Sequence, residues 1–254
     1  MLRSLLVTLF VTLPFTVAIS NIPSLDSPNI VLIIADDLGY NELNFMNNTR
    51  GIHCPQLDTL AFSGVVLKNY YVQPICSPTR SALMTGRYPI ALGTQANVIY
   101  WDTPWAPSLS NQFLPQYLQS LNFDTAMYGK WHLGMYTEAV TPWKRGFDSH
   151  AGYLQGCGSS GTHVASCCHA SSTPTDDDDF ICEREKGKDY RGYDWFTNGK
   201  PDVAANGTRT GEYYKRKINF KKKNCQCFFE RIFFCTNCFD SFVFLFCIHK
   251  KQLN

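Results

Sequence analysis

The hydrophobic pattern of the chain changes its period several times between residues 29 and 128. Three segments carry the apolar, β-branched or aromatic runs that are typical of strands: 29–35, 65–72 and 123–128. The first of these is an unbroken run, which predicts a buried strand of a parallel sheet covered on both faces. Two other segments have helical patterning and a proline near their start, 55–63 and 115–121. Strands and helices that follow one another in this way favour an α/β layered domain.

The stretch from Cys76 to Gly86 reads C-x-P-x-R-x-x-L-x-T-G and predicts a short helix. Pro78 suits the first turn of a helix, and Gly86 can close it in a left-handed cap. Cys76 would then lie at the helix N-terminus, where backbone N–H groups favour an anion, and Arg80 would follow one turn later. The alternative is a buried or disulfide-bonded cysteine before an ordinary helix.

Charged side chains follow the first and the third predicted strands. Asp36 and Asp37 stand at the carboxyl end of the first strand, where open α/β sheets place ligands, and a divalent cation would relieve their repulsion. A helix N-cap pair or a solvated turn is the alternative. Lys130 and His132 follow the third strand between glycines, and an extended backbone would turn both to the same side. A solvent-facing lysine and a structural histidine are the alternative there.

The N-terminus and the sequons indicate the secretory route. Residues 1–20 combine Arg3, an apolar run and a small-x-small site, which predicts a signal peptide; a membrane anchor is the alternative. Asn47 and Asn206 lie in N-x-T glycosylation sequons. The 11 cysteines are an odd number, so at least one is unpaired or modified. We therefore expect a lysosomal or extracellular protein, and the net charge of +2 indicates no particular class of partner.

The composition changes abruptly near Tyr213, where lysine clusters give way to a Phe- and Cys-rich stretch. We therefore divide the chain into a signal peptide (1–20), a partial catalytic domain (21–213) and a divergent tail (214–254) expected to lie outside the fold. Nucleic-acid binding does not suit a secreted chain, and charged residues argue against a stable membrane span. A zinc site on the tail cysteines has unfamiliar spacing. Translated non-coding sequence or an aberrant splice end is the preferred interpretation.

Taken together, the three motifs resemble the sulfatase family, with flanking residues closest to its arylsulfatase B-like (N-acetylgalactosamine-4-sulfatase-like) branch. The motifs are residues 29–40, 76–88 and 128–134, and the resemblance covers about residues 28–212. It implies an alkaline-phosphatase-like layered fold with a mostly parallel central sheet flanked by helices, incomplete at its C-terminus. It also implies hydrolysis of sulfate esters, either of sulfated sugars or of aryl sulfates.

The resemblance implies that Cys76 is converted to formylglycine by the formylglycine-generating enzyme of the endoplasmic reticulum. Pro78 and Arg80 match the recognition core of that enzyme, whereas Thr79 stands where serine is commoner. In this family one hydroxyl of the hydrated aldehyde attacks sulfur and displaces the alcohol. The second hydroxyl then collapses to the aldehyde and expels sulfate, so one hard step becomes two.

The same resemblance implies a role for each remaining motif residue. Asp36, Asp37 and the modified Cys76 would hold one Ca²⁺ ion. Arg80 would hold the formylglycine and the carboxylates in place. Lys130 would bind the sulfate group, and His132 would hold or activate the formylglycine diol.

Complete family members are about twice as long, and their later half supplies further calcium ligands and sulfate-binding side chains. The resemblance therefore predicts that this chain is truncated and weakly active or inactive as it stands. Three alternatives remain at this point. One is a phosphate or phosphonate monoester hydrolase of the same superfamily, and another is a non-catalytic secreted fragment that binds sulfated glycans. The third is a cysteine hydrolase that uses a Cys76 thiolate with His132.

Overall fold

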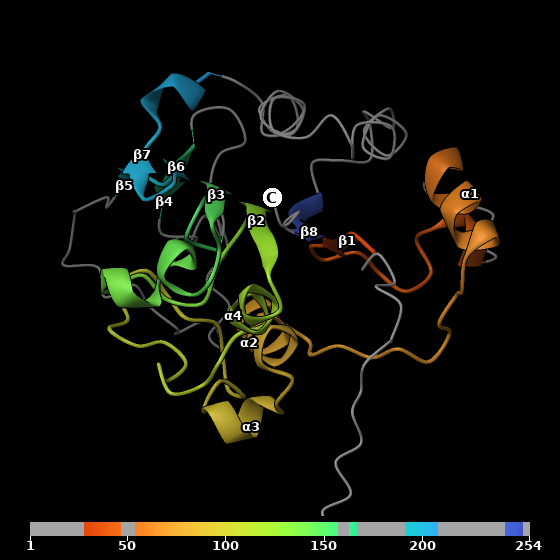
Figure 1. The fold of residues 1–254 in the computed structure, drawn as a ribbon, viewed down its shortest axis with the longest axis horizontal. Helices are drawn as coiled ribbons and strands as arrows, with labels where there is room; N and C mark the ends of the chain where they lie inside the picture. The colour runs from red at the N-terminus through yellow and green to blue at the C-terminus, as the bar shows by residue number, and fades with distance from the viewer. Residues whose placement is uncertain (1–27, 47–53, 157–162, 167–190, 208–241, 251–254) are drawn as a thin grey trace, which may run out of the picture.

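The computed structural model describes residues 28–46, 54–156, 163–166, 191–207 and 242–250. A six-stranded sheet in the order β1-β8-β2-β3-β6-β7 forms its centre (Figure 1). Its strands are β1 (Ile30–Ala35), β2 (Phe123–Gly129), β3 (Ser149–Gly152), β6 (Phe196–Thr197), β7 (Lys200–Pro201) and β8 (Phe242–Lys250). A separate pair consists of β4 (Val164–Ser166) and β5 (Arg191–Tyr193).

The sheet is mixed, which corrects the expectation of a mostly parallel sheet. β2 and β3 pair in parallel, whereas β8 runs antiparallel to both of its neighbours and β6 runs antiparallel to β3 and β7. β1, β2 and β3 still run in the same direction, because β8 reverses direction between β1 and β2. Their carboxyl ends therefore meet at one edge, as the sequence predicted for the motifs that follow β1 and β2.

Part of the C-terminal tail lies inside the sheet, contrary to the expectation for residues 214–254. β8 pairs with β1 from Ile30↔Ile248 and with β2 from Phe123↔Lys250 to Gly129↔Phe244. The physical reason is the β-propensity of a segment rich in Phe, Val and Ile next to two strands that each offer an open edge. The preceding part of the tail lies outside the described residues.

The helices confirm most of the sequence pattern. They are α1 (Pro55–Ser63), α2 (Cys76–Thr85), α3 (Pro89–Leu92) and α4 (Leu114–Ser120), with 3-10 turns η1 (Asn44–Met46), η2 (Glu138–Val140), η3 (Pro142–Lys144) and η4 (Val203–Ala205). Gly86 ends α2 in the left-handed conformation, with φ 66°, as predicted. None of the helices in the described ranges has the length and apolar character that a membrane crossing requires.

Alternate side chains of β2 build a core on each face of the sheet. Phe123 and Met127 join a cluster with side chains from α2 and α4, whereas Ala126 and Tyr128 pack with Trp195 on the other face. This alternation is the period of two expected for a strand. β1 contacts both clusters but is only half-buried, because it forms the edge of the described sheet. The prediction of a first strand buried on both faces is therefore only partly correct, since β1 is half-buried.

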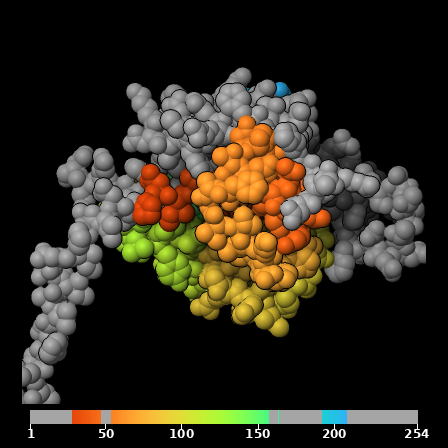
Figure 2. All heavy atoms as spheres, turned by 90° about the vertical axis from the view of Figure 1, so that its right-hand side faces the viewer, coloured from red at the N-terminus to blue at the C-terminus, as the bar shows by residue number. Residues whose placement is uncertain are grey.

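The second predicted strand, residues 65–72, is absent from the structure. The segment contains a turn at residues 68–69 instead, and its large apolar side chains are exposed: Val65, Leu67, Tyr70, Tyr71 and Val72. β-branched and aromatic residues form strands only where a neighbouring strand can pair with them. Figure 2 shows α1 and the following segment spread over the outer face of the molecule.

Candidate functional site

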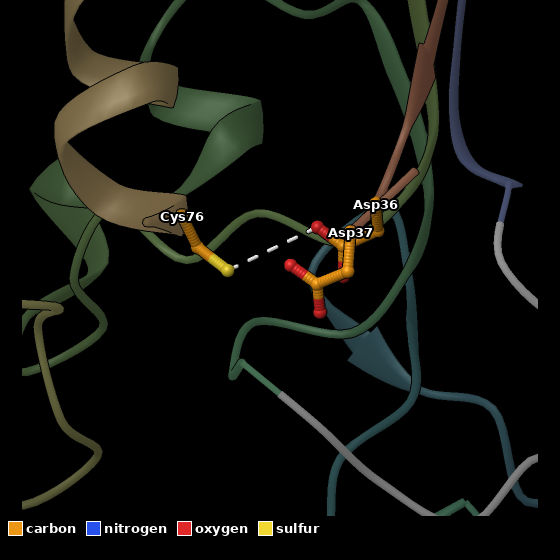
Figure 3. A group of neighbouring side chains, drawn as sticks. All are labelled: Asp36, Asp37 and Cys76. Atoms are coloured by element: carbon orange, nitrogen blue, oxygen red, sulfur yellow. Dashed lines mark hydrogen bonds between the residues drawn. The ribbon is translucent and has the colours of Figure 1, made fainter. Parts of the chain in front are cut away.

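The carboxyl end of β1 meets the N-terminus of α2. Asp36 and Asp37 follow β1 directly, and Cys76 is the first residue of α2, with its side chain directed towards the two carboxylates (Figure 3). One ligand atom from each residue lies within 4.8 Å of the other two, and Cys76 Sγ is 3.9 Å from Asp36 Oδ1. The backbone at Asp37 is left-handed, with φ 58°, which turns the chain away from the strand at this point.

Two buried cations converge on the Asp36 carboxylate. Arg80 donates to Asp36 Oδ1 at 2.8 Å and to the Lys130 carbonyl at 2.9 Å. Lys130 Nζ donates to Asp36 Oδ2 at 2.7 Å and lies 2.9 Å from Cys76 Sγ. The side chains of Arg80 and Lys130 are each 3% exposed, so these ion pairs are largely shielded from water and depend on one another.

The charge balance fixes the ionisation of Asp36. Burial alone raises the pKa of this carboxyl, but the positive charges and hydrogen bonds of Lys130 and Arg80 outweigh burial and hold the pKa below its ordinary value. Asp36 is therefore ionised at any physiological pH. Asp37, in contrast, is exposed. The pair thus has one carboxylate fixed to the protein and one open to solvent.

His132 borders this cluster, although its backbone is not extended. Its φ is 55°, an unfavourable region for a residue with a side chain, so the prediction of an extended backbone at this point is wrong. Hydrogen bonds impose this conformation: the His132 N–H donates to the Leu154 carbonyl at 3.0 Å, and the Ser77 hydroxyl donates to the His132 carbonyl at 2.7 Å. Ser77 Oγ also accepts the Ile99 N–H.

The His132 ring is buried, and its Nδ1 has no hydrogen-bond partner. Burial, together with the positive charges of Lys130 and Arg80, lowers the pKa of His132 to about 3. The ring is therefore neutral at physiological pH, and it can accept a proton or a hydrogen bond. No hydrogen bond joins it to Cys76 among the described residues, where Lys130 lies against the sulfur instead.

Three residues near the site carried no signal in the sequence. No sequence pattern indicates the role of Ser77, because its hydroxyl bonds to the backbone carbonyl of His132, which is distant in the sequence. Tyr153 is half-buried, and its pKa is raised by burial and by the nearby Asp36 charge. Asp194 is buried after β5 and accepts two backbone N–H groups; burial raises its pKa, and those hydrogen bonds oppose the rise. No local motif indicates any of these contacts, because each depends on tertiary packing.

The features that indicated secretion fall partly within the described residues. Asn206 is exposed at the end of η4, which leaves it accessible for glycosylation. Cys54 is disulfide-bonded. The predicted signal peptide and Asn47 lie outside the described residues.

Acid is expected to destabilise the fold through two buried histidines. Burial lowers the pKa of His150 to about 3, like that of His132, and neither His150 ring nitrogen has a hydrogen-bond partner. Since the unfolded chain binds these protons near pH 6.5 and the folded chain only near pH 3, stability rises with pH between those limits. Each histidine contributes up to about 1.4 kcal/mol per pH unit.

Urea unfolding at pH 7 and pH 5 measures this effect. His150→Gln should reduce the pH dependence without removing a residue of the candidate site. Equal stability at the two pH values would contradict the buried, neutral state of both rings.

The sequence comparisons agree on one family. A family model described as Sulfatase matches residues 28–162, more than half of the chain. Arylsulfatase J of Mus musculus is 45% identical over 136 residues, which are 54% of this chain and 22% of that protein. Human arylsulfatase A is 38% identical over 127 residues, and human N-acetylgalactosamine-6-sulfatase is 35% identical over 133; each match covers 49% of this chain and 25% of the relative. The chain thus matches only about a quarter of their length.

The structural comparisons agree with the fold class. Ps i-CgsB, solved in complex with k-i-k-neocarrahexaose, has a TM-score of 0.58 and 30% identity, covering 75% of this chain and 41% of that chain. Another structure of Ps i-CgsB has a TM-score of 0.59 at 21% identity and shows the likeness of fold alone. The predicted alkaline-phosphatase-like α/β fold is thereby confirmed. The arylsulfatase B-like branch stays a prediction.

Proposed function

Because the chain belongs to the sulfatase family, we propose that the cluster around Cys76 is a sulfuric ester hydrolase site that works through formylglycine and calcium. The observation that carries this proposal is the position of Lys130. Its ammonium group contacts both Asp36 and the Cys76 sulfur, which joins three separate sequence motifs at one point. A positive group beside a nucleophile position is what a sulfate ester requires.

The candidate ligands Asp36, Asp37 and Cys76 fit calcium only if Cys76 is modified. Asp36 and Asp37 offer the carboxylate oxygens that Ca²⁺ prefers, whereas the thiol of Cys76 is a soft ligand that this hard cation disfavours. Conversion of Cys76 to hydrated formylglycine would place an oxygen where the sulfur now stands. Modification and metal binding are therefore proposed to depend on each other. When bound, calcium would neutralise negative charge on the sulfate oxygens and on the nucleophile.

Lys130, Arg80 and His132 would each have a separate role in the reaction. Lys130 would bind the sulfate group electrostatically, and Arg80 would fix Asp36 through its 2.8 Å hydrogen bond. The neutral His132 ring is suited to accept a proton or hydrogen bond from the formylglycine diol, because burial and two nearby cations disfavour its charged form. Exclusion of water by the buried Arg80 and Lys130 strengthens these interactions.

Conversion of Cys76 is tested by mass spectrometry of the secreted chain. The peptide that contains Cys76 should show the mass loss expected when a thiol side chain becomes an aldehyde. Cys76→Ser should lower aryl-sulfate hydrolysis by about 10³-fold or more relative to the converted chain, because serine offers an oxygen but no aldehyde. An unmodified thiol in secreted material, or full turnover by Cys76→Ser, would refute the assignment.

Substrate class and location follow as proposals. Arylsulfatase-type relatives suggest an aryl sulfate or a sulfated sugar as substrate, and the formylglycine-generating enzyme would be the partner in the endoplasmic reticulum. The Cys54 disulfide and the exposed Asn206 support the secretory pathway, with a lysosomal or extracellular destination. Parallel assays with sulfate and phosphate monoesters separate sulfatase activity from phosphatase activity. Binding of sulfated glycan without any turnover would favour the non-catalytic fragment.

A further inference from the structure

Asp194 uses both carboxylate oxygens to fix two consecutive peptide groups. It lies directly after β5 and is only 6% exposed. Its Oδ1 accepts the Leu154 N–H at 3.0 Å, and its Oδ2 accepts the Gln155 N–H at 2.8 Å. A buried carboxylate with two such bonds holds its partner segment firmly, because breaking either bond would leave a charged oxygen without compensation.

The segment fixed by Asp194 is the one against which His132 rests. The Leu154 carbonyl accepts the His132 N–H at 3.0 Å, and the Tyr153 carbonyl accepts the Trp131 N–H at 2.9 Å. The His132 ring packs on the backbone of Gly156 so closely that a Cβ at Gly156 would collide with ring atom Cε1. Both the backbone and the imidazole of His132 thus depend on residues 153–156.

We propose that Asp194 is a positioning residue for His132, acting through the Leu154–Gly156 segment. His132 needs such support for two reasons. Its left-handed backbone is held by surrounding contacts, and its Nδ1 has no hydrogen-bond partner, so packing against residues 153–156 has to help hold the ring. The significance of His132 for catalysis rests on the proposed function, but the coupling to Asp194 is a property of the fold and can be tested without any activity.

The test follows the imidazole signals of His132 by NMR in the ¹⁵N-histidine-labelled chain, assigned with His132→Gln. Asp194→Asn replaces one acceptor oxygen with an NH₂ group, so either the Leu154 N–H or the Gln155 N–H faces a donor. We expect the His132 ring signals to shift or broaden and the amides of Trp131 and His132 to exchange at least about tenfold faster, while α4 keeps its protection.

Asp148→Asn is the control. Asp148 also accepts a backbone N–H, from Thr125 at 2.8 Å, but it is exposed and lies at the opposite end of β2. Its replacement should leave the His132 signals unchanged. Equal effects of both variants on His132 would show general loosening and overturn the proposal.

Gly156→Ala supplies a second, independent variant that keeps the buried carboxylate. Its added methyl should displace the His132 ring and shift the same signals. Unchanged His132 signals in folded Asp194→Asn, or in Gly156→Ala if Asp194→Asn fails to fold, would refute the coupling. Because these readouts use no substrate, an inactive chain still tests the positioning role, whereas failed conversion of Cys76 bears only on the proposed function.

Discussion

Asp36→Asn is expected to abolish calcium binding and also to lower the free energy of unfolding by about 3–5 kcal/mol, because it removes the negative charge that is bonded to both buried cations, Arg80 and Lys130. Both cations are bonded to this one carboxylate, at 2.8 and 2.7 Å. The loss of metal and the loss of stability therefore have the same origin. Calcium titration of the chain with converted Cys76 and urea unfolding of the metal-free chain measure the two effects separately.

Asp37→Asn is the matched control for this prediction. Asp37 is exposed, and no hydrogen bond to its carboxylate is seen within the described ranges. Its replacement should weaken calcium binding but leave metal-free stability within about 0.5 kcal/mol of the parent. If both variants kept full calcium affinity, the metal assignment would fail. If Asp36→Asn had the same urea midpoint of unfolding as the parent chain, the buried ion pairs would not support the fold.

Removal of residues 242–254 is expected to abolish cooperative unfolding, which is a larger loss than any single substitution described above. β8 pairs with β1 on one side and with β2 on the other, and it is the only strand between them in the described sheet. Without β8, both strands would expose unpaired backbone groups, each worth about 1 kcal/mol when bonded. The Asp36 end of β1 and the Lys130 end of β2 would no longer be held in register.

Thermal unfolding by circular dichroism and size-exclusion chromatography would measure the loss, with aggregation through the open edges as a further expected sign. Removal of residues 251–254 alone is the control, since it keeps β8 intact. A synthetic peptide of residues 242–250 should restore part of the lost structure by adding a strand. A truncated chain that unfolds at the parent temperature would show that β8 contributes little.

Elements with a strong local pattern were predictable from the sequence. Pro55 and Gly64 bounded α1, Gly86 ended α2 as predicted, and the apolar run before Asp36 formed a strand. Residues 65–72 had a comparable strand pattern and formed none, since the same propensity needs a pairing partner that the fold did not supply. β8 shows the converse: a segment expected to lie outside the fold became a strand because two open edges accepted it.

The candidate site was likewise predictable from the sequence only in part. The candidate residues could be named from the sequence alone, because Asp36, Cys76 and Lys130 stand in short motifs whose residue types and spacing are specific. How these residues meet depends on the fold, which sets Lys130 against both Asp36 and Cys76, gives His132 a left-handed backbone and bonds Asp194 to the segment that His132 contacts. Motif chemistry is local, whereas burial, charge pairing and ring orientation arise from segments that come together only when the chain folds.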